Sequence, residues 1–281
     1  MFNFPIGAML ESFKLPTRDA IKQAASIGAK GIQMHSTYGE HSPEQMTDEK
    51  IKELLAMMND SGLVFSAICG DLGHGFGHAE LNDGLVEKSK RILDLAKKLG
   101  TNVVTTHIGV VPTDPSNPRY EIMRNACLEL AEYADSMDAH FAIETGPETA
   151  VVLKQFLDSL DSHGVAVNLD PANLAMVVGD DPVKAVYTLR DYIVHTHAKD
   201  GKMLYRKNPE MIYGVIPDTE KDKGPAYAEM PLGQGSVDYP AYLAALDDIG
   251  YRGFLTIERE CGDTPVDDIK MAADFLRGII G

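Results

Sequence analysis

Eight short apolar runs, each followed by a segment with helical periodicity, recur along the 281 residues of this sequence. The apolar runs lie at residues 1–9, 31–35, 64–69, 102–107, 141–144, 165–170, 193–198 and 254–258. The helical patterns lie at 17–27, 48–61, 84–99, 120–136, 150–160, 182–189, 239–249 and 266–279. Near-continuous apolar strands that alternate with helices imply a parallel sheet whose faces are covered by those helices.

Eight such units in roughly 250 residues have the size of a (β/α)₈ TIM barrel. The main alternative is an open, doubly wound sheet. That fold usually carries a G-x-G-x-x-G turn after its first strand, and none occurs here. We therefore predict a single α/β domain over residues 1–281, folded as a (β/α)₈ TIM barrel.

The segment 201–235 does not fit the alternating pattern. It contains Pro209, Pro217, Pro225 and Pro231 and shows no clear periodicity. We expect an irregular insertion after the seventh strand, long enough to form a lid or an oligomer contact. A homo-oligomer is therefore one of the assemblies that this sequence allows.

The last four strand-like runs each bring a charged or imidazole side chain to their carboxyl ends. These side chains are Glu144, Asp170, His197 and Glu258. In a closed barrel the four strands are neighbours, and functional groups gather at the carboxyl ends. Strand side chains alternate between faces, so His195 points the same way as His197 while Thr196 points the opposite way. We expect the four side chains to converge above the barrel core.

Three carboxylates held close together repel one another, and a divalent cation relieves that repulsion. Oxygen ligands with one imidazole favour Mn²⁺, with Mg²⁺, Co²⁺ or Zn²⁺ as alternatives, whereas a structural zinc site prefers sulfur. The sequence thus predicts one divalent metal ion at Glu144, Asp170, His197 and Glu258. The alternative for each residue taken alone is a solvated strand end.

Five motifs resemble those of the xylose isomerase-like TIM barrel superfamily, and within it the sugar phosphate isomerase/epimerase group. They are Ala142-Ile143-Glu144-Thr145, Leu169-Asp170-Pro171-Ala172-Asn173, His195-Thr196-His197-Ala198-Lys199-Asp200, Leu232-Gly233-Gln234-Gly235 and Thr256-Ile257-Glu258-Arg259-Glu260. The resemblance spans the whole chain and is densest after residue 140. It implies that Glu144, Asp170, His197 and Glu258 hold one divalent metal ion.

The resemblance also implies a reaction. A ketone oxygen and a neighbouring hydroxyl of a sugar would chelate the metal, which acidifies the adjacent C–H and stabilises an ene-diolate. Glu144 and Glu258 would act as the catalytic acid and base, on opposite faces of that carbon. Proton return gives epimerisation or aldose–ketose isomerisation, and loss of a β-hydroxyl would make the protein a lyase or dehydratase. The expected partner is a small sugar or sugar phosphate.

Three further residues are predicted to bind substrate. His107 closes the fourth strand, where members of the superfamily often carry a pocket histidine. Lys199 either binds oxygens of the substrate or a phosphate, or forms a structural ion pair with Asp200. Asn173 stands where ketose 3-epimerases often have a histidine that touches substrate, which points to a different substrate here. We interpret His195 as a packing residue or as one that supports the site without binding the metal.

Two other functions are weighed against this one. An apurinic endonuclease shares the barrel but uses three zinc ions. This chain has Asn173 where those nucleases have histidine, and it has Tyr227 and Glu229 where they carry aspartate and histidine. The second is a barrel that binds sugar without catalysis, and the retained Glu144/Glu258 pair argues against it.

Charge and composition exclude several other classes of partner. A net charge of −16 argues against binding nucleic acid or an anionic membrane surface. No apolar run approaches the roughly 20 residues that span a bilayer, and we expect no signal peptide. Three cysteines without a CxxC spacing, Cys69, Cys127 and Cys261, favour a reducing, cytoplasmic location.

Overall fold

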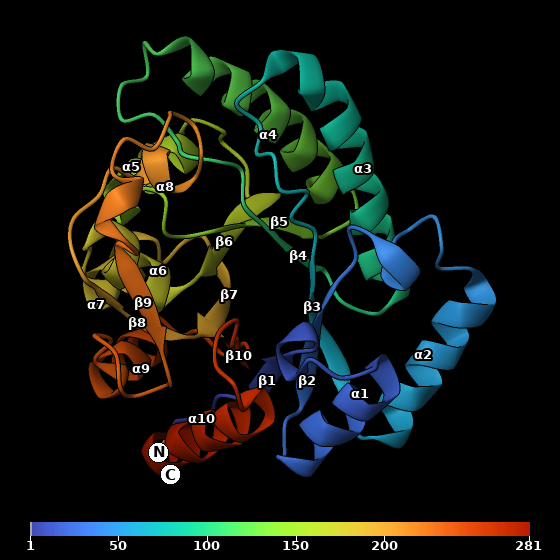
Figure 1. Cartoon of the computed structure of the whole chain (residues 1–281). Coiled ribbons are helices and arrows are strands. Elements are labelled where there is room, and N and C mark those ends of the chain that lie inside the picture. Colours follow the sequence, from blue (N-terminus) through green and yellow to red (C-terminus); the bar gives the residue numbers. More distant parts are fainter. Residues whose placement is uncertain (1) are drawn as a thin grey trace.

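Eight parallel strands close into a barrel in the computed structural model, which describes residues 2–281 (Figure 1). Around the barrel the order is β1-β10-β7-β6-β5-β4-β3-β2. The strands are β1 (Ile6–Met9), β2 (Gly31–His35), β3 (Val64–Cys69), β4 (Val103–Thr106), β5 (His140–Glu144), β6 (Val165–Leu169), β7 (Ile193–Ala198) and β10 (Leu255–Ile257). The predicted (β/α)₈ barrel is confirmed. Strands β5, β6, β7 and β10 are consecutive neighbours, as the strand-end prediction requires.

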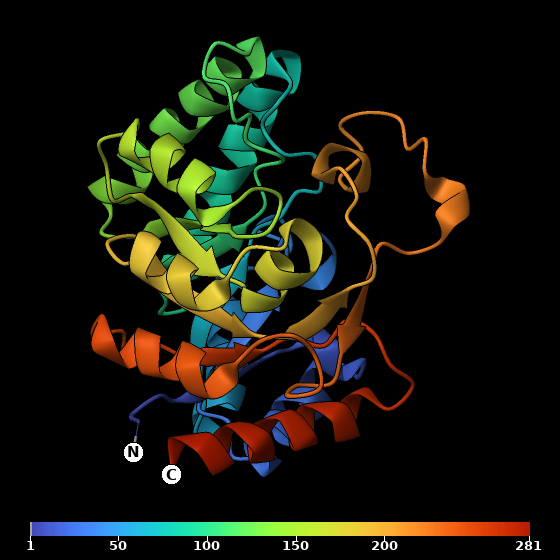
Figure 2. The same cartoon turned by 90° about the vertical axis from the view of Figure 1, so that its left-hand side faces the viewer.

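Helices surround the barrel, as Figures 1 and 2 show from two directions. The main ones are α1 (Thr17–Ser26), α2 (Asp48–Asp60), α3 (Ala79–Lys98), α4 (Pro118–Ser136), α5 (Ala150–Asp158), α7 (Pro182–Thr188), α9 (Tyr239–Asp248) and α10 (Pro265–Ile280). Each buries an apolar stripe, such as Ile269, Ala273 and Leu276 in α10. Within residues 2–281, no helix is both long and apolar enough to cross a membrane.

The barrel interior changes from apolar to polar towards the carboxyl ends of the strands. Ala67, Val103 and Ala142 form a small buried apolar cluster with Val194 packed against it. Val103 and Ala142 lie two residues before Thr105 and Glu144, so they share the inward face of those side chains. Buried polar side chains follow on the barrel strands, among them Gln33, Thr105, Asn168, His195 and Thr256. Buried polar groups need hydrogen-bond partners. This polar layer lies next to the carboxyl ends, where the candidate site forms.

The segment 201–235, expected to be irregular, has local order. A short antiparallel sheet pairs β8 (Asp200–Met203) with β9 (Tyr227–Met230), and two helical turns, α8 (Pro209–Ile212) and η4 (Lys221–Lys223), lie between them. Part of this segment projects from the body of the molecule, as the orange ribbon in Figure 2 shows. After β6 the chain forms two turns that the sequence did not predict, α6 (Pro171–Asn173) and the π-helical η3 (Leu174–Val178).

The carboxylate of Asp200 connects this segment to the end of β7. It accepts hydrogen bonds from the backbone N–H groups of Gly233, Gly235 and Val237, at 2.8–3.1 Å. The backbone of Gly235 comes so close that an added Cβ would lie 1.9 Å from Oδ1 of Asp200. Glycine is therefore the residue that this contact requires.

Candidate metal centre

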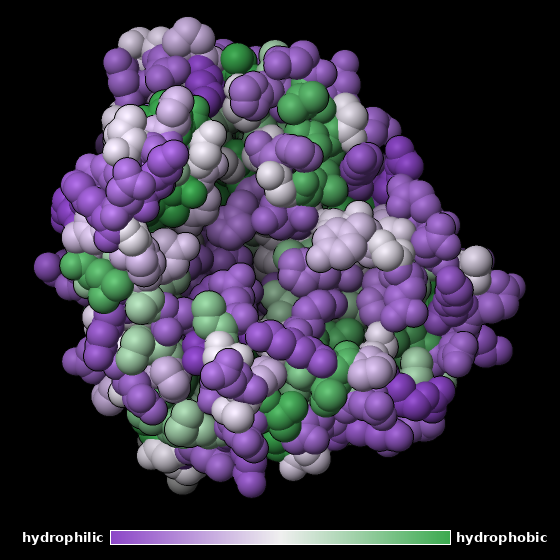
Figure 3. Space-filling model, in the orientation of Figure 1, coloured by the Kyte–Doolittle hydropathy of each residue, from purple (hydrophilic) through white to green (hydrophobic). Residues whose placement is uncertain are grey.

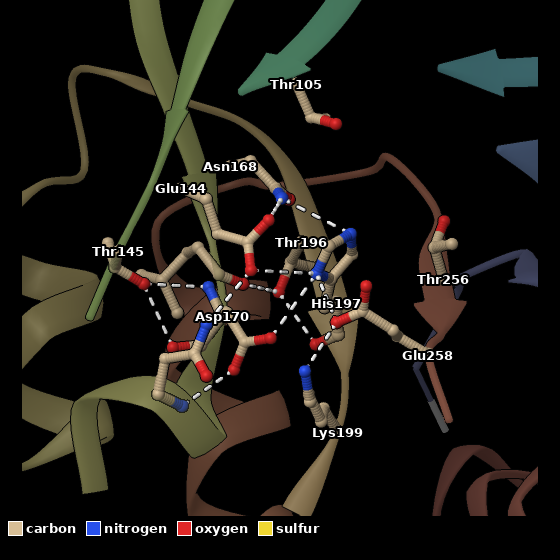
Figure 4. A network of polar contacts seen from close by, with 12 residues as sticks. Thr105, Glu144, Thr145, Asn168, Asp170, Thr196, His197, Lys199, Thr256 and Glu258 are labelled. Carbon is tan, nitrogen blue, oxygen red and sulfur yellow. Dashed lines mark hydrogen bonds and ion pairs between the residues drawn. The ribbon is translucent and has the colours of Figure 1, made fainter. Parts of the chain in front are cut away.

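Four side chains from neighbouring strands meet at the carboxyl end of the barrel (Figure 4). Glu144 ends β5, Asp170 follows β6, His197 lies in β7 and Glu258 follows β10. One ligand atom from each lies within 4.8 Å of the others. The convergence expected from the strand ends is therefore present in the structure, and all four side chains are at most 11% exposed.

Local hydrogen bonds hold Asp170 in place. Its Oδ1 accepts the backbone N–H of Asn173 at 2.8 Å and caps the turn α6. The hydroxyl of Thr145 accepts the backbone N–H of Asp170 and donates to its carbonyl, which joins the ends of β5 and β6. Because Oδ1 is occupied by the cap, Oδ2 is the oxygen that faces His197, at 3.3 Å from Nδ1.

The orientation of His197 is fixed from below by Gln33. The Gln33 amide nitrogen donates to the hydroxyl of Thr105 at 2.9 Å, which turns its oxygen towards His197. Nε2 of His197 lies 3.0 Å from that oxygen and donates to it. Nδ1 then faces the carboxylates of Asp170, Glu258 and Glu144, at 3.3, 3.4 and 3.7 Å. This is the nitrogen that would bind a metal.

A second set of hydrogen bonds orients Glu144. Asn168 donates to Oε2 at 3.2 Å and Asn173 donates to Oε1 at 2.9 Å. The Asn168 oxygen accepts from Nδ1 of His195, whose Nε2 lies 3.0 Å from the hydroxyl of Thr256. His195 therefore lies beneath the cluster and does not join it. Through these hydrogen bonds, the polar layer inside the barrel helps to orient Glu144.

The electrostatics of the cluster favour a cation. Burial raises the pKa of Glu258, but Lys199 and His197 lower it by more, to well below the usual value. Burial also raises the pKa of Glu144, and His107 and His197 reverse that shift. Burial lowers the pKa of His197, whereas Glu258 and Glu144 raise it well above normal. Ionised carboxylates beside one imidazole nitrogen are the donor set that a hard divalent ion fits.

Lys199 is buried beside this cluster. Its Nζ lies 2.9 Å from Oε2 of Glu258 and also pairs with Glu260. The alternative pairing with Asp200 does not occur, because the Asp200 carboxylate binds backbone N–H groups instead. Lys199 therefore stabilises the ionised form of Glu258.

His107 and Asn173 both lie against Glu144. Nε2 of His107 is 3.6 Å from Oε1 of Glu144, and the imidazole is partly exposed. Asn173 donates its hydrogen bond to the same oxygen. In this structure Asn173 orients Glu144, and the predicted contact of either residue with substrate stays a prediction.

A cavity of about 560 Å³ opens above the cluster, and Figure 3 shows the hydrophilic hollow on this face. Glu144, Glu258, Lys199, His107 and Asn173 line it. Further lining residues were not predicted from the sequence, namely His35, Tyr213, Tyr227 and Glu229. The last three come from the segment 201–235. Nothing local in the sequence marks them, because the β8–β9 pairing brings them to the cavity.

Comparison with known proteins identifies relatives of this barrel. A family model described as "Xylose isomerase-like TIM barrel" matches residues 21–279. A xylose isomerase domain protein from Planctomyces limnophilus is 26% identical, with a TM-score of 0.79 over 99% of this chain and 97% of that one.

Two more distant structures share the fold. A probable 3-DHS dehydratase from Bacillus anthracis is 21% identical, with a TM-score of 0.75 over 98% of this chain and 99% of that one. A 3-keto-D-glucoside 4-epimerase from E. coli is 15% identical, with a TM-score of 0.72 and the same coverage of 98% and 99%.

One curated relative is much longer than the region of it that matches this chain. A probable M18 family aminopeptidase 1 from Thermotoga maritima is 27% identical over 185 residues, which is 64% of this chain. The matching region spans 37% of that protein's length.

Proposed function

Because the chain belongs to the xylose isomerase-like TIM barrel family, we propose that it is a metal-dependent sugar isomerase or epimerase. The reaction would move a proton at a carbon beside the carbonyl of a sugar or a sugar-like polyol ketone. The observation that carries this proposal is the cluster of Glu144, Asp170, His197 and Glu258 at the floor of a sugar-sized cavity. The relatives named as an epimerase and a dehydratase share the fold on which the proposal builds.

The four clustered side chains would hold one divalent ion, with Mn²⁺ as the expected metal. Three oxygen ligands and Nδ1 of His197 suit Mn²⁺ or Mg²⁺. When bound, such an ion polarises a carbonyl oxygen and stabilises negative charge that develops on it. The protein supplies the remaining parts of the reaction.

Glu144 and Glu258 are the proposed acid and base. Ligand oxygens of these two residues lie within 4.8 Å of each other, and both residues line the cavity. One carboxylate would take the proton from carbon, and the same or the other one would return it, a contribution of about 10²–10⁴-fold in rate. Asn168 and Asn173 keep Glu144 oriented, and Lys199 keeps Glu258 ionised. Rigid placement of this kind is what proton transfer requires.

A second candidate function is that of a lyase or dehydratase, and the position of Lys199 favours it. The ammonium of Lys199 is 2.9 Å from Glu258 and lines the cavity. It could donate a proton to a departing hydroxyl next to the carbon that loses its own proton. In that case the product is unsaturated, and it differs from an epimer by the loss of water.

The test combines metal analysis with isotope exchange. Wild-type protein and a Glu144→Gln/Glu258→Gln double variant are incubated with Mn²⁺, dialysed and analysed for metal. Ketoses and inososes are then incubated with each protein in D₂O and followed by NMR. We expect about one ion per chain, deuterium in one substrate, and loss of both in the double variant.

An exposed carboxylate provides the matched control. Glu121→Gln removes one exposed carboxylate that does not line the cavity, so this variant should keep metal binding and exchange. Unsaturated product in place of exchange would favour the dehydratase. Three zinc ions per chain would favour a nuclease. The absence of both bound metal and deuterium exchange would contradict the proposal.

A further inference from the structure

A second cavity of about 640 Å³ lies at the same end of the barrel. The loops after β4 and β5, the turn η3 and the residues 206–210 enclose it. It has the volume of a small-molecule site, and the proposed reaction does not use it.

The walls of this cavity combine apolar surface with a few polar groups. Valine and proline residues, among them Val110, Val152 and Pro147, line much of it. Glu148, Arg206 and Glu210 add polar groups. The lining has no excess of basic residues, which disfavours a polyanionic occupant. A cavity wall that combines apolar side chains with several hydrogen-bonding groups fits a neutral, polyhydroxylated ring.

Glu148 is an unusual wall residue because it is only 5% exposed and only one of its two carboxyl oxygens has a hydrogen-bond partner among residues 2–281. Its Oε2 accepts the backbone N–H of Val111 at 3.1 Å, while its Oε1 has no hydrogen-bond partner among residues 2–281. A buried polar atom without a partner is rare in folded proteins. Burial also raises the pKa of Glu148 to about 8, so at neutral pH the group is a carboxylic acid that can donate a hydrogen bond.

The two cavities adjoin each other. Val177 lines both, and the region of α8 contributes Glu210 to the second cavity and Tyr213 to the first. A ligand that extends from the metal cluster past Val177 would enter the second cavity.

We propose that the second cavity binds a further sugar ring, so that the natural substrate has at least two rings. This inference rests on the proposed function, because the reacting ring would lie beside Glu144 and Glu258. The second ring would place its C–H face on the valine and proline walls and its hydroxyls towards Glu148 and Arg206.

Binding measurements on the Mn²⁺-loaded protein test this proposal. Calorimetric titration compares the one-ring probe D-glucose with the two-ring probes cellobiose and maltose. We expect at least one two-ring probe to bind about tenfold or more tightly than D-glucose. Val152→Trp, which fills the second cavity, should abolish this preference.

Two variants complete the design. Val151→Trp is the matched control, because Val151 lies on the same helix but is 56% exposed and does not line the cavity. Arg206→Ala removes a polar group from an exposed position, so the variant protein should fold normally. Loss of this group should weaken the binding of two-ring probes about three- to tenfold.

The proposal is wrong if neither two-ring probe binds more tightly than D-glucose, or if Val152→Trp keeps the preference. Metal binding with deuterium exchange into one-ring ketoses would then still support the proposed function. A two-ring preference without exchange into any ketose would instead count against the reaction and not against the second cavity.

Discussion

The side-chain oxygen of Gln33 on β2 lies 3.0 Å from Nε2 of His197 on β7, across the interior of the barrel. The contact selects the form of His197 that presents Nδ1 to the three carboxylates. A residue that contacts none of those carboxylates thus decides which nitrogen is offered to a metal.

Replacing Gln33 should therefore weaken metal binding. Gln33→Leu keeps the volume of the side chain but removes the acceptor for Nε2, and loss of such supporting hydrogen bonds typically costs about 10–100-fold in metal affinity. The dissociation constant for Mn²⁺, measured by calorimetry, checks this. Gln45→Leu, at an exposed position, is the control. An unchanged dissociation constant for Gln33→Leu would show that Gln33 does not orient His197.

Metal addition should stabilise the fold. Ligands that bind only the native state raise the free energy of unfolding by about 2.7 kcal/mol at 100 times their dissociation constant. We expect Mn²⁺ to raise the melting temperature of the wild type, and EDTA to reverse the rise. Asp170→Asn removes one ligand charge, so its melting temperature should respond much less to Mn²⁺. An equal response of both proteins would mean that Mn²⁺ binds elsewhere.

Gly235→Ala should destabilise the segment that follows β9. The new Cβ would lie 1.9 Å from Oδ1 of Asp200 and would displace the carboxylate from its three backbone donors. Overpacking of this kind costs about 1–3 kcal/mol. Urea denaturation measures the change in the free energy of unfolding.

Gly84→Ala is the control for Gly235→Ala. Gly84 lies inside α3. Apart from its chain neighbours and the backbone of its own helix, no atom of residues 2–281 comes within 4 Å of its added Cβ, so alanine should stabilise that helix by about 0.5–1 kcal/mol. If both variants change stability in the same direction, the steric interpretation of Gly235 is wrong.

Glu148 should make stability depend on pH. The unfolded chain loses this proton near the ordinary glutamate pKa of 4.5, whereas the native protein keeps it up to about 8 because the group is buried. Between these values the unfolded state binds fewer protons, so the free energy of unfolding falls as pH rises. Glu148→Gln mimics the protonated acid. Its stability relative to wild type should therefore increase with pH and level off above about 8.

The measurement for Glu148→Gln is urea denaturation at several pH values. Taking the difference between variant and wild type cancels the other titrating groups. Glu121→Gln, at an exposed surface position, should show no such trend. A flat difference for Glu148→Gln would mean that Glu148 is ionised in the native protein.

The barrel could be predicted from the sequence because the pattern that reveals strands and helices is local. The predicted strands at 31–35 and 64–69 match β2 and β3 to the residue. The start of α3 was placed at residue 84, but the helix begins at Ala79. Gly84 lies on an exposed face inside the helix, where glycine is tolerated at a modest cost.

The four clustered side chains could also be predicted, because parallel strands of a barrel align their carboxyl ends at one rim. Gln33 could not. Its partner His197 lies 164 residues away, and a glutamine within an apolar run carries no sign of which strand it will face. Tyr213 and Glu148 were missed for the same reason, since their positions depend on loops that only the tertiary structure brings together.

The segment between β8 and β9 supplies walls to both cavities, whereas the clustered ligands all come from the barrel rim. Under the proposed function, part of the surface that a ligand would touch thus comes from a segment that supplies none of the four clustered side chains. Exchange of residues 201–235 between related barrels could redirect a protein of this kind to a new compound without rebuilding its reactive centre. Evolution, or a protein engineer, could therefore vary what such a barrel acts on through one contiguous stretch of sequence.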